Sequence, residues 1–157
     1  MTCQEWKDLM AAALDQRWRE AFAMRTRLDE IQAKIADRKS RVCDVNHPQH
    51  SEECCQLITE FESATLASTA NTYDMLLSAI GNAGGWAGQV NCQEECWCHF
   101  AIEADQWYQE VQRWFATFQA AVEFWQSFLD DLAKRGCGTP PSTGPIPVNP
   151  FPPVWTP

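Results

Sequence analysis

The sequence predicts an all-α protein, an up-down-up bundle of three long helices followed by an extended Pro-rich C-terminal arm. Apolar residues recur every three or four positions in three long segments, as on helix faces that pack against other helices. Turn-forming residues separate these segments. Eight of the nine Pro residues follow residue 139, where neither a helix nor a central strand could continue. We therefore expect the bundle over residues 1–137 and the arm over residues 138–157.

The first helix is expected over residues 2–42. Thr2 is predicted to cap it, and Glu5, three residues later, completes a capping box. Arg17 occupies the one polar position in an otherwise apolar, heptad-like stripe that we expect to face the other helices. The apolar members of this stripe are Met10, Leu14, Ala21, Met24, Leu28, Ile31 and Ile35.

The second helix is expected over residues 51–80, with Ser51 as its cap. Gly81 is predicted to end it in a left-handed conformation, so that the Gly-rich residues 81–90 form a connector. Within this helix, residues 63–70 carry only small side chains apart from Leu66. Such a surface lets a neighbouring helix with large side chains approach closely.

The third helix is expected over residues 91–135, with Asn91 and Glu94 as a second capping box and Gly136 just past its end. Its apolar stripe is Ala104, Trp107, Val111, Trp114, Phe118, Ala121, Trp125, Phe128 and Leu132. With Tyr108, Phe115 and Phe124, the aromatic side chains cover roughly 200° of the helix circumference. Two interpretations stay open: a large core packed on the second helix, or a face that also contacts another chain.

The C-terminal arm is expected to be polyproline-like and on the order of 60 Å long, at ~3.1 Å per residue. A simple spacer would combine Pro with small polar residues. This arm also carries large apolar side chains, which we expect to bind a partner. They are Ile146, Val148, Phe151, Val154 and Trp155.

The three-helix topology separates the eight cysteines into two sets of four, one for each end of the helices. The first set is Cys3, Cys92, Cys96 and Cys98, and the second is Cys43, Cys54, Cys55 and Cys137. We expect two disulfides within each set. Cys54 and Cys55 point about 100° apart on a helix, which favours Cys43 and Cys137 as their separate mates. Cys3 is expected to bond one of the three cysteines at the start of the third helix.

Zinc binding is the alternative use of these side chains. Cys3, Cys92, Cys96, Cys98 and His99 could supply one ligand set, and Cys43, His47, His50, Cys54 and Cys55 another. Their spacing does not match the paired CxxC pattern typical of structural zinc sites. We therefore expect no metal, no other cofactor, and histidines that act as loop or cap residues.

Charge and motifs exclude several classes of function. The net charge of −9 disfavours binding to nucleic acid and to anionic membranes. The first residues lack the basic and apolar regions of a secretory signal. The Gly-rich residues 81–90 contain no Lys of a phosphate-binding loop. His99 adjoins Cys98 but would point away from it on a helix, so no activated thiolate is expected. We expect the protein not to be an enzyme.

Eight cysteines without a secretory signal, together with the arm over residues 140–157, give the chain a construction that resembles small accessory virion proteins of tailed bacteriophages. These are capsid decoration, linking or neck proteins. The resemblance implies a structural protein that is synthesised in the host cytoplasm and located in the virion. It would dock on the particle through its arm and aromatic surface. Its partners would be protein subunits of the assembly, with a homo-oligomer left open.

The arm also permits a third reading, an adaptor whose tail is bound by SH3- or WW-like modules. Residues 147–150 and 150–153 each place Pro at both ends of a four-residue segment, as such modules require. No Arg or Lys lies beside these segments, although SH3 ligands commonly use one.

Overall fold

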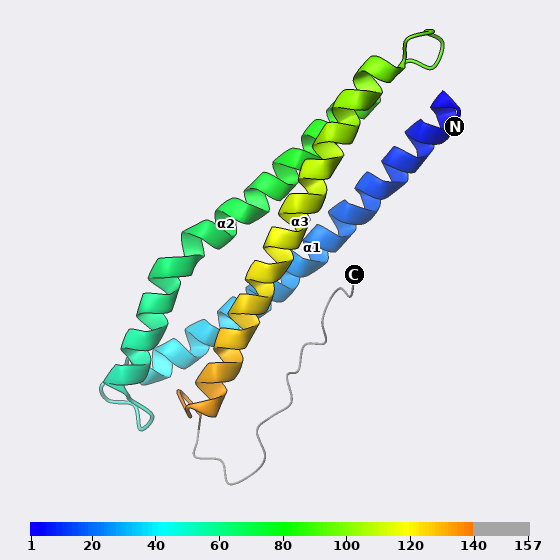
Figure 1. The fold of residues 1–157 in the computed structure, drawn as a ribbon. Helices are drawn as coiled ribbons and strands as arrows, with labels where there is room; N and C mark the ends of the chain where they lie inside the picture. Colours follow the sequence, from blue (N-terminus) through cyan, green and yellow to red (C-terminus); the bar gives the residue numbers. More distant parts are fainter. Residues whose placement is uncertain (140–157) are drawn as a thin grey trace. The chain divides into compact units, whose positions relative to one another are not determined.

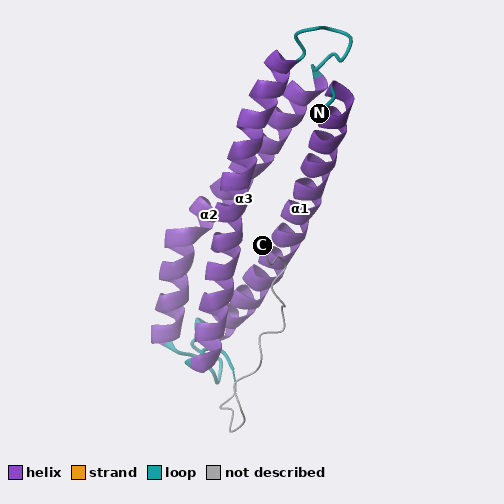
Figure 2. Cartoon of the chain, turned by 45° about the vertical axis from the view of Figure 1, so that its right-hand side comes forward, coloured by secondary structure: helices purple, strands orange, loops and turns teal. Residues whose placement is uncertain are grey.

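The computed structural model describes residues 1–139, and these fold into three helices (Figure 1). The helices are α1 (Cys3–Val42), α2 (Glu52–Gly88) and α3 (Cys98–Lys134). Turns and loops connect them, and no strand occurs in the described part of the chain (Figure 2). The predicted all-α class with three long helices is confirmed. Residues 140–157, which make up most of the predicted arm, lie outside the described residues.

The chain forms two compact units, and each helix contributes to both. The first unit combines Met1–Ala23 with Ala70–Gln119, and the second combines Met24–Thr69 with the described residues that follow Gln119. Helix α1 runs from the first unit into the second, α2 returns, and α3 repeats the direction of α1. This order is the up-down-up topology that the sequence predicts.

The apolar stripe of α1 forms a continuous part of the core. All seven of its apolar residues are buried, and Ala21, Ile31 and Ile35 are completely inaccessible. On α3, five members of the predicted stripe are buried: Ala104, Val111, Phe118, Trp125 and Leu132. The other four, which include Trp107 and Trp114, are half-buried. Periodicity therefore identified the inward face of both helices correctly.

Two helix starts are fixed by the predicted caps. The backbone N–H of Glu5 donates to Thr2 Oγ1 at 3.1 Å, and the N–H of Cys54 donates to Ser51 Oγ at 3.2 Å. Each hydroxyl thus satisfies one of the N–H groups that the first turn of a helix leaves without a partner.

The predicted end of the second helix is wrong, because α2 continues through Gly81 to Gly88. Ala83, Ala87 and Val90 are buried and extend the apolar period of Leu76 and Ile80. Each Gly in a helix costs roughly 0.5–1 kcal/mol relative to Ala. Burial of this face offsets that cost, so the apolar period outweighs the glycines.

The predicted start of the third helix is also wrong, because α3 begins at Cys98 rather than near Asn91. The Asn91 side chain accepts a hydrogen bond from the N–H of Gln93 at 3.0 Å, and its carbonyl accepts one from the N–H of Glu94 at 3.2 Å. Asn91 therefore stabilises a turn in the connector over residues 89–97. The helix starts only where Ala101 and its neighbours meet the core.

The end of α3 follows the prediction for Gly136. Gly136 has φ +72°, its N–H donates to the carbonyl of Ala133 at 3.1 Å, and the N–H of Cys137 donates to that of Leu132 at 2.9 Å. This pair of bonds is a Schellman motif. Leu132 and Cys137, the two residues that the second bond joins, are both buried. The turn directs Cys137 inward.

Candidate functional site

The first cysteine set forms one bridge. Cys3, at the start of α1, is bonded to Cys92 in the connector, with a Cα–Cα distance of 5.5 Å and a sequence separation of 89 residues. Cys96 and Cys98 are free and exposed. The expected second bridge in this set is therefore not formed. Because α3 begins only at Cys98, Cys96 lies in the connector, and Cys92 alone meets Cys3.

Aromatic side chains and one cation surround the bridge of the first unit. Trp6, Trp97 and Phe100 pack against a buried cluster of Cys3, Val90 and Ala101. Lys7 Nζ donates to the carbonyl of Val90 at 2.7 Å, just past the end of α2. A cation at this position interacts favourably with the negative end of the helix dipole.

The second cysteine set forms two bridges, Cys43–Cys55 and Cys54–Cys137. The adjacent residues Cys54 and Cys55 thus bond different mates, as their directions on a helix require. The first bridge closes the loop between α1 and α2, and the second joins the start of α2 to the end of α3. All three bridges of residues 1–139 lie within one or the other of the two predicted sets.

Arg38 repeats in the second unit the role of Lys7 in the first. Its Nη1 donates to the carbonyl of Cys137 at 2.9 Å, past the end of α3. Burial lowers the pKa of Arg38, the nearby charge of Arg41 lowers it further, and Asp37 opposes both. Gly138 lies directly against Arg38: a Cβ at this glycine would come within 3.2 Å of the Arg38 backbone. Gly138, the first residue of the predicted arm, is therefore packed against α1.

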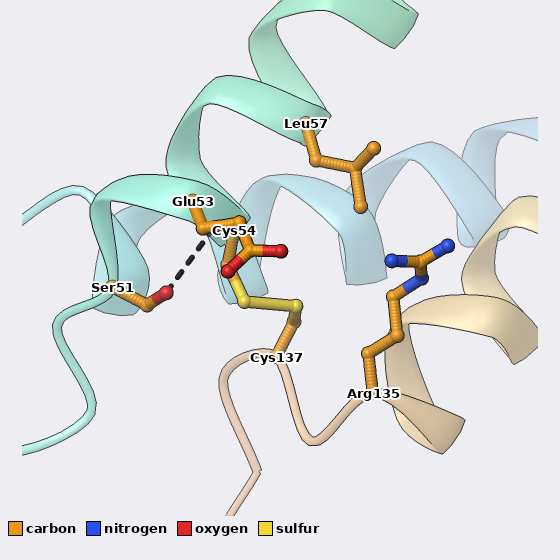
Figure 3. A pocket seen from close by; sticks show the side chains of 6 residues that line it. All are labelled: Ser51, Glu53, Cys54, Leu57, Arg135 and Cys137. Atoms are coloured by element: carbon orange, nitrogen blue, oxygen red, sulfur yellow. Dashed lines mark hydrogen bonds between the residues drawn. A yellow bond between two sulfur atoms is a disulfide. The ribbon is translucent and has the colours of Figure 1, made fainter.

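A pocket of about 320 Å³ lies beside the Cys54–Cys137 bridge (Figure 3). Its lining combines the two bonded sulfurs with an apolar, an acidic and a basic side chain. Ser51 Oγ accepts the helix-capping bond from Cys54, and Arg135 is paired with Asp131 at 2.8 Å. The polar groups around the pocket thus serve to hold the ends of α2 and α3. The lining residues are Ser51, Glu53, Cys54, Leu57, Arg135 and Cys137.

The structure does not assemble the proposed zinc ligands. Cys3 and Cys92 of the first proposed zinc ligand set are bonded to each other, and the three cysteines of the second ligand set are also in disulfides, so none of them offers a thiolate. Within residues 1–139, no group of three His, Cys, Asp or Glu side chains could hold a metal ion. His47 Nδ1 accepts the N–H of Gln49 at 3.0 Å, so His47 stabilises its loop. His99 is exposed and its ring contacts Phe100.

The aromatic face of α3 is divided between core and surface. Trp125 is buried, and its indole N–H donates to Thr69 Oγ1 at 2.9 Å. Phe61 of α2 stacks on Phe128 with a ring-centroid distance of 3.8 Å. Phe124, in contrast, is 56% exposed. The interpretation of a large core packed on α2 therefore holds for most of this face, and an outer edge at Phe124 remains accessible. Contact of this edge with another chain stays a prediction.

Further large apolar side chains lie on the surface of each unit. Leu9 is 58% exposed and Trp18 is 48% exposed on α1, and Ile102 is 53% exposed on α3. In the second unit, Leu66 and Phe124 are similarly accessible. The predicted partner-binding residues of the arm (Ile146, Val148, Phe151, Val154 and Trp155) lie outside the described residues.

Sequence reasoning missed three side chains that hold these elements together: Lys7, Arg38 and Thr69. Each acts on a group that is distant in sequence, with separations of 83, 99 and 56 residues. Nine of the chain's 12 Lys and Arg residues precede residue 44. This concentration of positive charge in α1 was the one feature of the sequence that pointed to a role for Lys7 and Arg38.

None of the helices in residues 1–139 combines the length and the apolar character that a membrane crossing requires. Comparison of the chain with family models, with curated proteins and with solved structures gives no match.

Proposed function

We propose that this chain is a non-enzymatic structural protein of a larger assembly, which it binds through apolar side chains on its surface and on residues 138–157. The observation that carries the proposal is a crosslinked helical scaffold with large apolar side chains left on its surface. Where such side chains lie together in one patch, they favour contact with another protein. Trp18, Phe22 and Phe124 are the largest of those that the structure describes.

The bridges support a scaffold role in oxidising surroundings. Disulfides persist outside the reducing cytosol, and they restrict the unfolded chain more than the folded one. A crosslinked scaffold holds its surface side chains in fixed positions, which lowers the entropy cost of binding.

We further propose that the assembly is the virion of a tailed bacteriophage. The support is the resemblance of construction: eight cysteines, and an arm that combines Pro with Phe and Trp. Such a protein would be made in the host cytoplasm and become oxidised after lysis. Its partners would be protein subunits of the particle.

The test is incorporation of the full chain into particles. Tagged protein is expressed during infection, virions are separated on a density gradient, and each fraction is probed for the tag. We expect wild-type protein to migrate with the particles. The double variant Phe151→Ala with Trp155→Ala should lose at least 10-fold of this signal, because burying each side chain contributes about 2 kcal/mol.

A matched variant, Thr143→Ala with Thr156→Ala, changes two polar residues of the same arm and should be incorporated normally. Absence of the wild-type chain from every particle fraction would refute the virion proposal. Normal incorporation of the Phe151 and Trp155 variant would show that the arm is not the anchor.

A further inference from the structure

Cys96 and Cys98 remain thiols in a chain whose other six cysteines are bonded in pairs. Both are exposed; Cys96 lies in the connector and Cys98 is the first residue of α3. Because the other six cysteines are already in disulfides, the chain contains no third thiol with which Cys96 or Cys98 could pair.

A bridge between Cys96 and Cys98 themselves is disfavoured by the residue between them. Trp97 is half-buried, and its ring lies 6.2 Å from that of Trp6. This contact holds the turn that leads into α3. The two thiols are not bonded to each other in the structure, and a bridge across this single residue would have to bring their Cβ atoms to about 3.5–4.5 Å, against the position in which Trp6 holds Trp97.

Three interactions hold the connector, and with it the two thiols, in a fixed position. Cys92, four residues before Cys96, is bonded to Cys3. Lys7 binds the carbonyl of Val90 at 2.7 Å, where the connector begins. Trp97 anchors the segment between the thiols. A partner that reacts here therefore has little chain entropy to remove.

An exposed apolar side chain lies next to the thiols. Ile102 is four residues after Cys98, on the same face of α3, and it is 53% exposed. A partner that bonds Cys98 would also cover Ile102 and gain apolar burial.

We propose that Cys96 and Cys98 join two copies of this chain through two interchain disulfides. In a two-fold symmetric pair each contact occurs twice, so a second copy always brings two thiols with the matching spacing. A different protein would have to supply that same spacing independently. The two bridges would leave no cysteine of either copy unpaired. This proposal is independent of the proposed virion role.

Each bridge forms by exchange with a small-molecule disulfide such as oxidised glutathione. The thiolate of one copy attacks a sulfur of the oxidant, forms a mixed disulfide and expels one glutathione thiolate. The thiolate of the second copy then attacks the protein sulfur of that mixed disulfide and expels the other. Two protein thiols are oxidised, one glutathione disulfide is reduced, and the released glutathione takes up the two protons.

The test incubates the full-length protein with oxidised glutathione and separates the products by non-reducing electrophoresis and intact-mass spectrometry. The reaction is run in about 0.5 M salt, because Glu94 and Glu95 of two copies would repel one another and salt screens this repulsion. We expect a covalent species of twice the 17.9 kDa chain mass. Peptide mapping should find Cys96 and Cys98 in its interchain bridges.

The double variant Cys96→Ser with Cys98→Ser should yield at least 10-fold less covalent dimer, with an unchanged melting temperature. Gln93→Ser alters the same connector but keeps both thiols, and it should dimerise like the wild type. Three results would overturn the proposal: a monomer with glutathione on both thiols, a monomer with a Cys96–Cys98 bridge, or a covalent dimer that persists in the double variant.

Discussion

Trp125 is the largest of the completely buried side chains, and its indole N–H needs an acceptor inside the core. Thr69 of α2 provides it at 2.9 Å, and Thr69 Oγ1 in turn donates to the carbonyl of Thr65 at 2.8 Å. The small residues of α2 allow this close approach. One threonine thereby fixes the position of the most voluminous core residue of the second unit.

The variant Thr69→Val keeps the volume of this side chain but removes the acceptor. We expect the free energy of unfolding to fall by about 1–3 kcal/mol, because the indole N–H stays buried without a partner. Thr117→Val is the matched control, since Thr117 is exposed and bonds only its own helix at 2.9 Å. Urea denaturation measures both. Equal effects of the two variants would show that the Trp125–Thr69 bond contributes nothing.

Arg17 shows how a cation fits within an apolar stripe. Its guanidinium pairs with Glu20 at 2.9 Å and lies 4.1 Å from the centre of the Phe115 ring. Both contacts offset the free-energy cost of partly removing this charge from water. Periodicity identified the position of Arg17 but not its contact with Phe115, which depends on how α3 packs against α1.

Among the three helices, α2 is the one in which the glycines predict an earlier end than the packing of its apolar face allows. Its last eight residues contain four glycines, yet Ala83 and Ala87 continue its buried face. Gly85 shows the conflict most simply, because no atom lies within 4 Å of a Cβ added to it and its φ is not positive. Alanine would therefore fit at this position.

Gly85→Ala should raise the free energy of unfolding by about 0.5–1 kcal/mol, through the higher helix propensity of Ala. Gly138→Ala is the contrasting variant. It should destabilise the protein, because Gly138 has φ +73° and lies against the Arg38 backbone. Chemical denaturation compares the two. A destabilising Gly85→Ala would contradict the helical conformation of residues 81–88.

The ends of the helices show what the sequence can and cannot predict. Ends set by one side chain or one glycine were predictable: Thr2, Ser51 and Gly136 act as expected. The end of α2 and the start of α3 were not, because they depend on which apolar residues meet a core built from distant segments. The misplaced start of α3 also explains why the free thiols of Cys96 and Cys98 were not foreseen.

In the molecule as a whole, each of the two units is stabilised by the same two interactions. A disulfide joins elements 83 or more residues apart, and a cation of α1 binds a carbonyl just past the end of another helix. The order and direction of the three helices alone separate the cysteines into two sets. The pairing within a set depends on offsets of a few residues, which composition and periodicity do not determine.

Surface ion pairs contribute less to this arrangement. Within the two units they mostly join residues three or four apart on one helix, such as Arg19 with Asp15 and Arg41 with Asp37. Such pairs are worth roughly 0–1 kcal/mol. Lys39 with Glu62, at 2.8 Å, does connect α1 to α2. The basic character of α1 thus acts across helices mainly through Lys7, Lys39 and Arg38.

The disulfide map of the purified, air-exposed protein tests this account most directly. Free thiols are blocked by alkylation at low pH, and the chain is then digested and sequenced by mass spectrometry without reduction. We predict three bridges (Cys3–Cys92, Cys43–Cys55 and Cys54–Cys137), with alkylation or interchain bonding confined to Cys96 and Cys98. An intrachain bridge between the two sets, such as Cys3–Cys54, would contradict the three-helix arrangement.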